Sequence, residues 1–363
     1  MAPPRERNQP LKGRGALSNP TGRFERQQRE AVDDGWYQEE VPDFIPTSIE
    51  PDRARSVITR NDSPDIPFEQ SINPYRGCSH SCPYCYARPS HSYVGLSSGL
   101  DFETKLFYKK DAGKLLEEEL AKPGYVCKPI TLGANTDPYQ PIERRMRVTR
   151  DLMEVLARCR HPVTIITKSA LVLRDLDLLT DLAKDGLAGV GVSITTLDAE
   201  LKRVMEPQAA SPHARLEAVR RLSEAGVPTG VMVAPVIPAL TDHEMEGILE
   251  AAAAAGARWA GYVLLRLPYE VKDLFREWLA AHYPDRAEHV MSLVQQMRGG
   301  KDYDSSFGTR MRGTGPLAEL LHCRFQVACR RQGLNTARHQ PPNTSLFRAP
   351  RAAHSNPQLM LDL

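Results

Sequence analysis

The chain has 363 residues, of which 41% are hydrophobic and 25% charged, with a net charge of +2. The near-zero charge excludes binding of polyanions by overall charge alone, and no apolar run approaches the roughly 20 residues of a membrane-spanning helix. Seven cysteines form no disulfide framework, which is typical of a reducing compartment. We therefore expect a soluble cytoplasmic protein with no membrane partner, built as one large domain with additions or as two modest domains.

The N-terminal region is basic, with seven Lys or Arg against three Glu in residues 1–30. Its low apolar content favours a solvated tail as far as Pro20, and the alternative is an arm that contacts a phosphate backbone. Residues 33–69 are irregular and rich in proline. Residues 1–70 are thus predicted to be a basic, Pro-rich N-terminal arm and surface segment.

Strands and helices alternate in residues 71–284, which predicts a parallel sheet with helical crossovers. The expected strands are 71–76, 129–134, 163–167, 190–195, 229–237 and 262–267. The expected helices are 111–120, 142–159, 171–184, 214–225, 241–255 and 270–282. Thr241 and Glu244 have the spacing of a capping box at the start of the fifth of these helices. On pattern alone, a partial TIM-like barrel and an open doubly wound sheet fit equally well.

Two parts follow the alternating region. Residues 285–334 are predicted to be a C-terminal helical addition, with helices at 287–297 and 316–331. Residues 335–363 are rich in Pro, Asn and Arg and are expected to be a loose tail.

The segment 302–315 lies between the two added helices and has no regular pattern. It carries Tyr303, Phe307, Arg310 and Arg312. Irregular segments of this length in compact domains are commonly functional, and arginines suit phosphate recognition. We expect the segment to close the barrel mouth and to hold an anionic part of a substrate, and the alternative is a surface linker.

Three cysteines, Cys78, Cys82 and Cys85, directly follow the first expected strand at C-x₃-C-x₂-C spacing. Cysteine thiolates are the usual ligands of iron–sulfur clusters, and a [4Fe–4S] cluster takes up to four. Three thiolates on one loop would leave one iron open for a small molecule. The alternatives are a zinc site with His80 or His91 as fourth ligand, or three unrelated buried thiols.

Polar residues stand at the ends of the other expected strands, where the chemistry of such barrels gathers. Asn135 and Thr136 follow the second strand, Lys168 the third, Ser193 lies in the fourth, and Arg266 ends the sixth. Each of the first four also has a structural explanation as a turn residue, a surface lysine or a core hydroxyl. Arg266 is costly to bury without an anion, and a cofactor carboxylate or a substrate phosphate would serve.

The cysteine motif, with Tyr84 just before the third cysteine, resembles that of the radical S-adenosylmethionine (SAM) superfamily. Four further stretches, 71–78, 87–91, 135–141 and 265–268, are similar to the spore photoproduct lyase-like branch, often labelled DNA repair photolyase-like. Within it, the chain resembles a bacterial family of unassigned activity over about residues 13–335. The resemblance implies an α/β fold: a partial (β/α)₆ TIM-like barrel with an irregular N-terminal arm and a C-terminal helical addition.

The resemblance also implies the cofactors and their chemistry. Cys78, Cys82 and Cys85 would bind a [4Fe–4S] cluster whose open iron chelates SAM. The reduced cluster would cleave SAM to a 5′-deoxyadenosyl radical, which abstracts hydrogen from the substrate. An electron donor such as flavodoxin or ferredoxin would then be a partner.

Residues that contact SAM in the lyase are matched here by Lys168 and Ser193, and its second-strand contact by the loop of Asn135 and Thr136. Arg266 is grouped with these residues as cofactor-binding.

The chain departs from the lyase at its hydrogen-donor cysteine. The lyase places this cysteine at the end of the second strand, whereas the loop 133–137 has none and Cys127 lies before the strand. Thymine-dimer repair by the same relay therefore does not follow from the resemblance. DNA or another nucleic acid is one expected substrate, and a peptide or a small metabolite fits equally. The alternative function is a non-catalytic zinc- or cluster-binding module that interacts with nucleic acid or protein.

Overall fold

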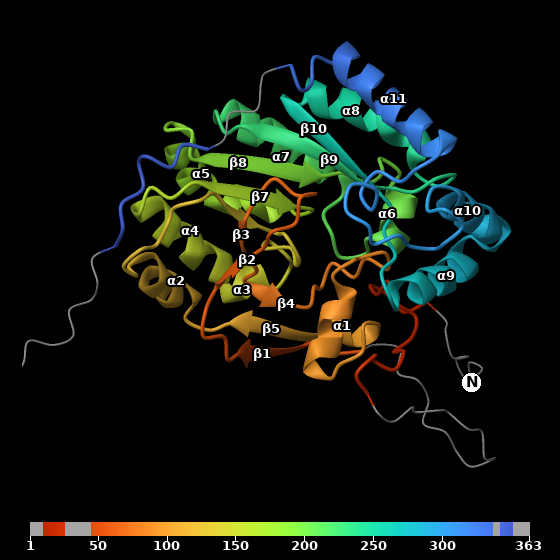
Figure 1. The fold of residues 1–363 in the computed structure, drawn as a ribbon, viewed down its shortest axis with the longest axis horizontal. Coiled ribbons are helices and arrows are strands. Elements are labelled where there is room, and N and C mark those ends of the chain that lie inside the picture. Colours follow the sequence, from red (N-terminus) through yellow and green to blue (C-terminus); the bar gives the residue numbers. More distant parts are fainter. Residues whose placement is uncertain (1–9, 26–44, 337–341, 351–363) are drawn as a thin grey trace, which may run out of the picture.

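The computed structural model describes residues 10–25, 45–336 and 342–350. Within these residues the main sheet has seven strands, six of them parallel, which confirms the predicted α/β fold class (Figure 1). In spatial order the strands are β10 (Trp259–Leu264), β9 (Thr229–Val236), β8 (Ala188–Ser193), β7 (Val163–Thr167), β6 (Ile130–Leu132), β3 (Gln70–Ile72) and the antiparallel edge strand β2 (Ile58–Arg60).

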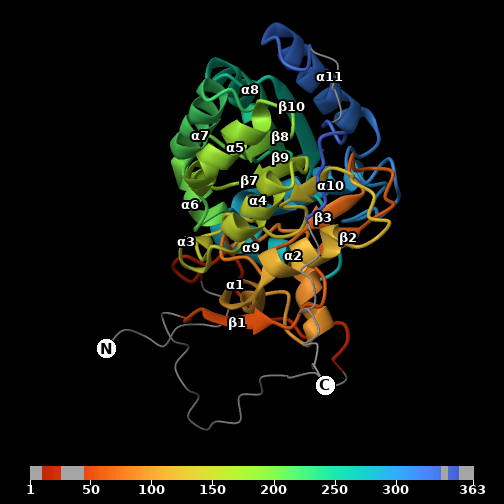
Figure 2. The same ribbon diagram turned by 90° about the vertical axis from the view of Figure 1, so that its left-hand side faces the viewer.

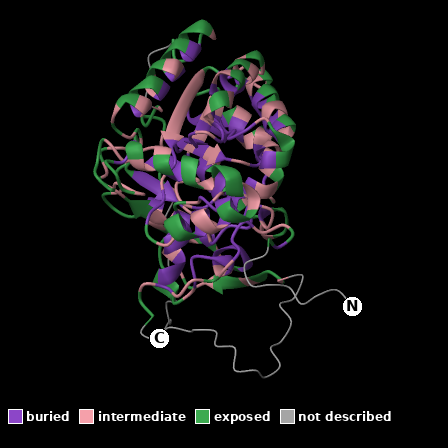
Figure 3. Cartoon of the chain, turned by 90° about the vertical axis from the view of Figure 1, so that its right-hand side faces the viewer, coloured by how far each residue is buried: buried purple, intermediate pink, exposed green. Residues whose placement is uncertain are grey.

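Helices connect the parallel strands, and α4, α5, α7 and α8 lie side by side over the outer face of the sheet (Figure 2). The connecting helices are α2 (Ala112–Leu120), α3 (Glu143–Met146), α4 (Val148–Arg158), η2 (Ala170–Asp175), α5 (Leu176–Ala183), α6 (Ala199–Met205), α7 (Pro212–Glu224), η3 (Asp242–Glu244) and α8 (Met245–Ala254). The strands between them are largely buried (Figure 3). None of the helices in the described ranges is long and apolar enough to cross a membrane.

Three predicted helices are divided, and one of them, expected at 241–255, begins as the 3₁₀ turn η3 before continuing as α8. The helix expected at 142–159 breaks at Arg147, whose φ of +57° is left-handed and interrupts helical geometry, so it forms α3 and α4. The helix expected at 171–184 begins as the 3₁₀ turn η2 before continuing as α5.

A second, three-stranded sheet lies beside the barrel and was not predicted. It has the order β1 (Ser48–Asp52), β5 (Lys105–Lys109), β4 (Tyr75–Arg76). The first predicted strand, 71–76, is therefore split, because β3 joins the main sheet while β4 pairs with β5. The connecting segment between β4 and β5 carries the cysteines, then η1 (Arg88–Val94) and α1 (Leu100–Thr104).

Residues 10–20 are packed, so the expectation of a solvated tail as far as Pro20 is wrong for them. Leu11, Ala16 and Leu17 are buried. A Cβ at Gly15 would lie 1.8 Å from the main-chain oxygen of Ser81, so a glycine lets this segment lie directly on the cysteine loop. Residues 1–9 lie outside the described residues.

The C-terminal addition contains α10 (Pro284–Gln296) and α11 (Pro316–Arg331), after α9 (Val271–His282) ends the barrel. The predicted loose tail lies mostly outside the described residues. In its described part, Phe347 packs against Tyr125 and His161.

The segment 302–315 spans the two edges of the barrel sheet. At one edge, the main-chain oxygen of Met311 accepts a 3.0 Å hydrogen bond from Leu264 in β10. At the other, Asp65, in the loop between β2 and β3, accepts hydrogen bonds from Arg310 Nε and from the amide of Gly308. Arg310 is thus paired with a carboxylate, which corrects its expected role as a substrate-binding arginine.

Candidate active site

The cysteine loop lies at the carboxyl edge of the parallel strands, as predicted from its place in the chain. It begins at Gly77, whose φ of +77° favours glycine. Two turns follow, closed by hydrogen bonds from the amide of Ser81 to Cys78 and from the amide of Cys85 to Cys82. Cys78 and Cys82 are each 7% exposed, so successive turns of one loop carry the thiols into the interior.

Burial raises the pKa of all three thiols. For Cys78, the nearby carboxylate of Asp137 raises the pKa further; for Cys82, Glu206 does so, to about 12. Such thiols ionise readily only beside a strong positive charge, which bound iron supplies. Within the described ranges, no three His, Cys, Asp or Glu side chains are close enough to hold one metal ion. Cysteine thiolates are the usual ligands of iron–sulfur clusters, so three thiols on one buried loop are a donor set that fits a cluster.

Each of the two histidines considered as zinc ligands has one ring nitrogen in contact with an oxygen atom. His91 Nε2 lies 2.9 Å from the main-chain oxygen of Lys105, and burial lowers the pKa of its imidazole to about 4. His80 Nδ1 lies 3.4 Å from a carboxylate oxygen of Asp137. These contacts alone do not exclude zinc, but no group of three His, Cys, Asp or Glu side chains in the described ranges could hold one metal ion, so the zinc alternative finds no support there.

The loop after β6 holds the cysteine loop from one side. Gln140 is fully buried; its Oε1 accepts a 2.9 Å hydrogen bond from the amide of Ser79, and its Nε2 donates to the main-chain oxygen of Gly77. Asp137 accepts a 2.7 Å hydrogen bond from the amide of Lys168. Gln140 was not predicted as a site residue, although it lies in the polar stretch that was singled out.

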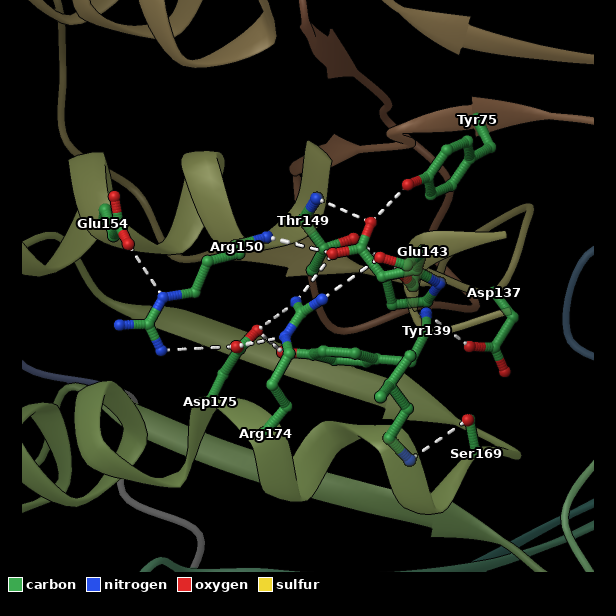
Figure 4. Close-up of polar contacts among 12 residues, drawn as sticks. Tyr75, Asp137, Tyr139, Glu143, Thr149, Arg150, Glu154, Ser169, Arg174 and Asp175 are labelled. Atoms are coloured by element: carbon green, nitrogen blue, oxygen red, sulfur yellow. Dashed lines mark hydrogen bonds and ion pairs between the residues drawn. The ribbon is translucent and has the colours of Figure 1, made fainter. Parts of the chain in front are cut away.

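A buried network fixes this second-strand loop in turn (Figure 4). The hydroxyl of Tyr139 donates to Asp175, and Glu143 accepts hydrogen bonds from Tyr75 and Arg174. Both carboxylates are fully buried, and Arg174 pairs with each. The network therefore places the loop without leaving an unpaired buried charge.

A second side of the cysteine loop is held by Arg88 and Glu103, both fully buried and paired with each other. Arg88 Nε donates a 2.8 Å hydrogen bond to the main-chain oxygen of Cys82. Glu103 accepts hydrogen bonds from the amides of Gly15 and Ala16, at 3.1 and 2.8 Å. One ion pair thus links the cysteine loop to the N-terminal segment that covers it.

The third support is Glu206, which is fully buried. Its carboxylate accepts hydrogen bonds from the hydroxyls of Tyr84 and Thr195 and pairs with Arg215. Burial alone would raise the pKa of Glu206, but the positive charges of Arg215 and Lys168 outweigh it and lower the pKa to about 2. A charged carboxylate therefore fixes the tyrosine beside Cys85.

Lys168 faces the barrel mouth, one of the two orientations left open by the sequence. Its Nζ lies 3.4 Å from the main-chain oxygen of Ala234 at the end of β9 and 5.9 Å from the centre of the Tyr84 ring. Ser193 ends β8 and is buried, and its main-chain oxygen accepts a hydrogen bond from Arg215. The structure thus brings Lys168 beside the cysteine loop and Ser193 to the same edge.

Asn135 and Thr136 are tied to the backbone before the cysteine loop. Their amides donate to Asn73 Oδ1, at 3.0 and 3.3 Å, and the Thr136 hydroxyl donates to the main-chain oxygen of Tyr75. Cys127 precedes β6 and so lies toward the opposite edge of the sheet.

Arg266 follows β10 at the other end of the sheet. Its guanidinium carbon lies 5.1 Å from the centre of the Tyr86 ring, and its Nη2 lies 3.3 Å from the hydroxyl of Tyr303. Tyr86 donates in turn to the main-chain oxygen of Ala134, after β6. The residue after the third cysteine therefore bridges the ends of two distant strands.

Comparison with solved structures finds a similar fold in spore photoproduct lyase complexed with dinucleoside spore photoproduct. The TM-score is 0.56 at 17% sequence identity, covering 79% of this chain and 80% of that one. A family model described as the radical SAM superfamily matches residues 72–252.

Among curated proteins, an uncharacterised protein of Mycobacterium tuberculosis is 37% identical over 233 residues, 64% of this chain and 68% of its own length. An uncharacterised protein of Methanocaldococcus jannaschii is 32% identical over 176 residues, 48% of this chain and 62% of its own. The radical SAM Nalpha-GlyT isomerase of Pseudomonas phage M6 is 22% identical over 270 residues, 73% of this chain and 51% of its own.

The residues that the radical SAM family model matches include the three-cysteine loop and most of the parallel strands of the main sheet. The chain belongs to the radical SAM superfamily. Its cofactors are accordingly a [4Fe–4S] cluster and SAM.

Proposed function

We propose that this protein is a radical SAM enzyme that cleaves SAM reductively and takes a hydrogen atom from a nucleic-acid substrate. The observation that carries the proposal is the position of the three thiols, at the carboxyl edge of the strands and beside Lys168. The nucleic-acid substrate is supported by the similarity to spore photoproduct lyase, whose structure is complexed with a dinucleoside spore photoproduct.

In this proposal Cys78, Cys82 and Cys85 hold the cluster. When bound there, the cluster and SAM would supply reductive cleavage of the sulfonium and abstraction of a hydrogen atom from the substrate. The electron comes from a carrier of the flavodoxin or ferredoxin type.

The chain's own residues orient the cofactor. Lys168 reaches into the mouth with no carboxylate in ion-pair distance within the described ranges, so its ammonium is available for the carboxylate of SAM. Ser193 and the loop of Asn135 and Thr136 line the same edge and complete the proposed cofactor contacts.

The test uses full-length protein with its cluster reconstituted without oxygen. It is incubated with dithionite and SAM, alone and with single-stranded DNA, duplex DNA, RNA or a mixed peptide, and 5′-deoxyadenosine is quantified by chromatography. We expect product in every case and faster formation with one class of nucleic acid. An iron-replete protein that forms no 5′-deoxyadenosine would refute the chemistry, whereas stimulation by the peptide alone would refute the substrate class.

A further inference from the structure

The charge of Arg266 has no counter-ion in the described part of the chain. Its Nε is buried without a hydrogen-bond partner. Its terminal nitrogens contact only neutral groups, the hydroxyl of Tyr303 at 3.3 Å and the sulfur of Met311 at 3.4 Å. A poorly solvated guanidinium without an anion is unfavourable, and a ligand that supplies one would be bound strongly.

Arg298 places a second positive charge next to Arg266. It is 4% exposed, and its terminal nitrogens donate to the main-chain oxygens of Thr309 and Leu265, at 3.0 and 2.9 Å. Burial lowers the pKa of Arg298, and the charge of Arg266 lowers it further, which places the two guanidinium groups within reach of each other's field.

The nearby negative charge is already engaged. Asp304 acts to raise the pKa of Arg298, yet its carboxylate accepts hydrogen bonds from the Thr309 hydroxyl, at 2.6 Å, and from the amide of Ser306, at 2.9 Å. It forms no ion pair within 4 Å with either arginine. The two arginines together therefore have an excess of positive charge.

The site is open to solvent beside the cysteine loop. Tyr86, whose ring centre lies 5.1 Å from the Arg266 guanidinium carbon, is 44% exposed although it directly follows Cys85, and Arg266 is itself partly exposed. A cation–π contact of this kind favours one position of the guanidinium and leaves its N–H groups able to donate to an anion. The guanidinium N–H groups of Arg266 would thus already be positioned for a ligand that enters from solvent.

Lys168 and Arg266 lie near the two tyrosines that precede and follow Cys85 in the sequence. Lys168 lies over Tyr84 and reaches the end of β9, whereas Arg266 lies over Tyr86 and follows β10. If Lys168 serves the carboxylate of SAM, the position of Arg266 suits a second anion on another molecule.

We propose that Arg266 and the Tyr303 hydroxyl bind a phosphate group of the substrate. The inference rests on the proposed function and deepens it, because it assigns the substrate's anchoring group. It also replaces the cofactor-binding role expected for Arg266 from the sequence. The terminal nitrogens of Arg266 donate to phosphate oxygens, Tyr303 donates to a further oxygen, and Arg298 adds its field.

The experiment measures binding of two probes to anaerobically reconstituted protein: a fluorescein-labelled 12-nucleotide single-stranded DNA, and inorganic pyrophosphate. Arg266→Gln is compared with the matched control Arg330→Gln, which removes one charge from an exposed position on α11. Arg266→Lys keeps the positive charge but loses the planar guanidinium, which can donate two parallel hydrogen bonds. The cluster absorbance and circular dichroism of each variant check that it is folded.

We expect Arg266→Gln to weaken binding of both probes about tenfold or more, the size of one lost charge-assisted hydrogen-bonded contact, and Arg330→Gln to change neither affinity. Arg266→Lys should recover only part of the affinity. The salt dependence of DNA binding should become shallower by about 0.7 in log–log slope for one lost phosphate contact.

Two outcomes would overturn the assignment. One is failure of the wild-type protein to bind either probe. The other is an Arg266→Gln variant that binds both probes as the wild type does but binds SAM more weakly. That result would show that Arg266 binds the cofactor and not the substrate. Binding of pyrophosphate but not DNA would support the phosphate site while removing nucleic acid from the proposed function.

Discussion

Buried and partly buried arginines lie in two different environments around the cysteine loop. Arg88 and Arg215, which support the loop, are at most 1% exposed and pair with fully buried carboxylates, Glu103 and Glu206. Arg266 and Arg298, at the β10 side, have no carboxylate in ion-pair distance within the described residues, and both leave an Nε without a partner. The two sides of the mouth thus differ in whether the protein itself balances its charges.

The difference distinguishes arginines that hold the cysteine loop in place from arginines that could bind a ligand. A paired and fully hydrogen-bonded charge holds its neighbours in one arrangement and offers little to a ligand. An unbalanced charge is costly in the free protein, and that cost is relieved when an anion arrives. We infer that Arg88 and Arg215 support the cysteine loop. The side of Arg266 is where we propose that the substrate binds.

The largest expected effect comes from removing a thiol from the fixed side. Cys82→Ala should lose most of the about four irons per chain that the anaerobically reconstituted protein holds, because the remaining two cysteines cannot retain a [4Fe–4S] cluster. Iron and sulfide analysis with visible absorbance measures the loss. The control is Cys323→Ala, since this cysteine is exposed on α11; full iron content in Cys82→Ala would contradict the ligand assignment.

The next effect tests the buried pair itself. Glu103→Gln leaves the Arg88 guanidinium fully buried and without a negative partner, which costs about 3–5 kcal/mol in unfolding free energy for such pairs. Anaerobic urea unfolding of the reconstituted protein measures it. Glu200→Gln is the control, because its pair with Arg203 is exposed and should contribute less than about 1 kcal/mol. Equal, small losses in both variants would remove the distinction between a supporting pair and a surface pair.

Many strands and helices of the barrel were predictable because buried elements carry a regular spacing of apolar residues in the sequence. The strand Val163–Thr167 and the helix Pro316–Arg331 were predicted to the residue, since each has a clear apolar period and a sharp boundary. The small sheet was not, because the strand Ser48–Asp52 is polar and partly exposed and carries no such period. Its partners are more than fifty residues away, a separation that local patterns do not report.

Tertiary contacts also overrode a local motif. The predicted capping box of Thr241 and Glu244 does not form: the Thr241 hydroxyl accepts a hydrogen bond from the amide of Ile237, and Glu244 binds Thr196 and the amide of Leu197. The same spacing suits both uses, so the sequence alone could not choose between them.

The sequence predicted site residues from their positions at strand ends, but it did not predict the residues with which they form contacts. Lys168 could be placed at a strand end, yet only the structure puts it beside Tyr84. Gln140, Glu103 and Glu206 gave no signal as supports, because their partners come from distant segments. The pairing of Arg310 with Asp65, 245 residues apart, was hidden for the same reason.

A smaller effect is expected at the cation of the cofactor side. Lys168→Ala should weaken SAM binding by about 1–3 kcal/mol, the scale of a lost charge-assisted hydrogen bond. Calorimetry under anaerobic conditions with the cluster present measures the affinity. Lys114→Ala, an exposed lysine on α2, is the matched control. Equal affinities in the two variants would show that Lys168 does not contact the cofactor.

The smallest expected effect concerns the connection between the two edges of the barrel sheet. Asp65 is 6% and Arg310 18% exposed in their side chains, so the pair is shielded but not fully buried, and Asp65 also keeps its hydrogen bond from Gly308 when Arg310 is removed. A double-mutant cycle with Asp65→Ala, Arg310→Ala and the double variant should give a coupling of about 1 kcal/mol in unfolding free energy. The same variants should bind pyrophosphate nearly as the wild type does, because Arg266 carries the proposed phosphate contact and Arg310 is already paired. A large loss of pyrophosphate binding in Arg310→Ala would instead return the segment 302–315 to the anion-binding role expected from its sequence, and would weaken the contrast between balanced and unbalanced arginines.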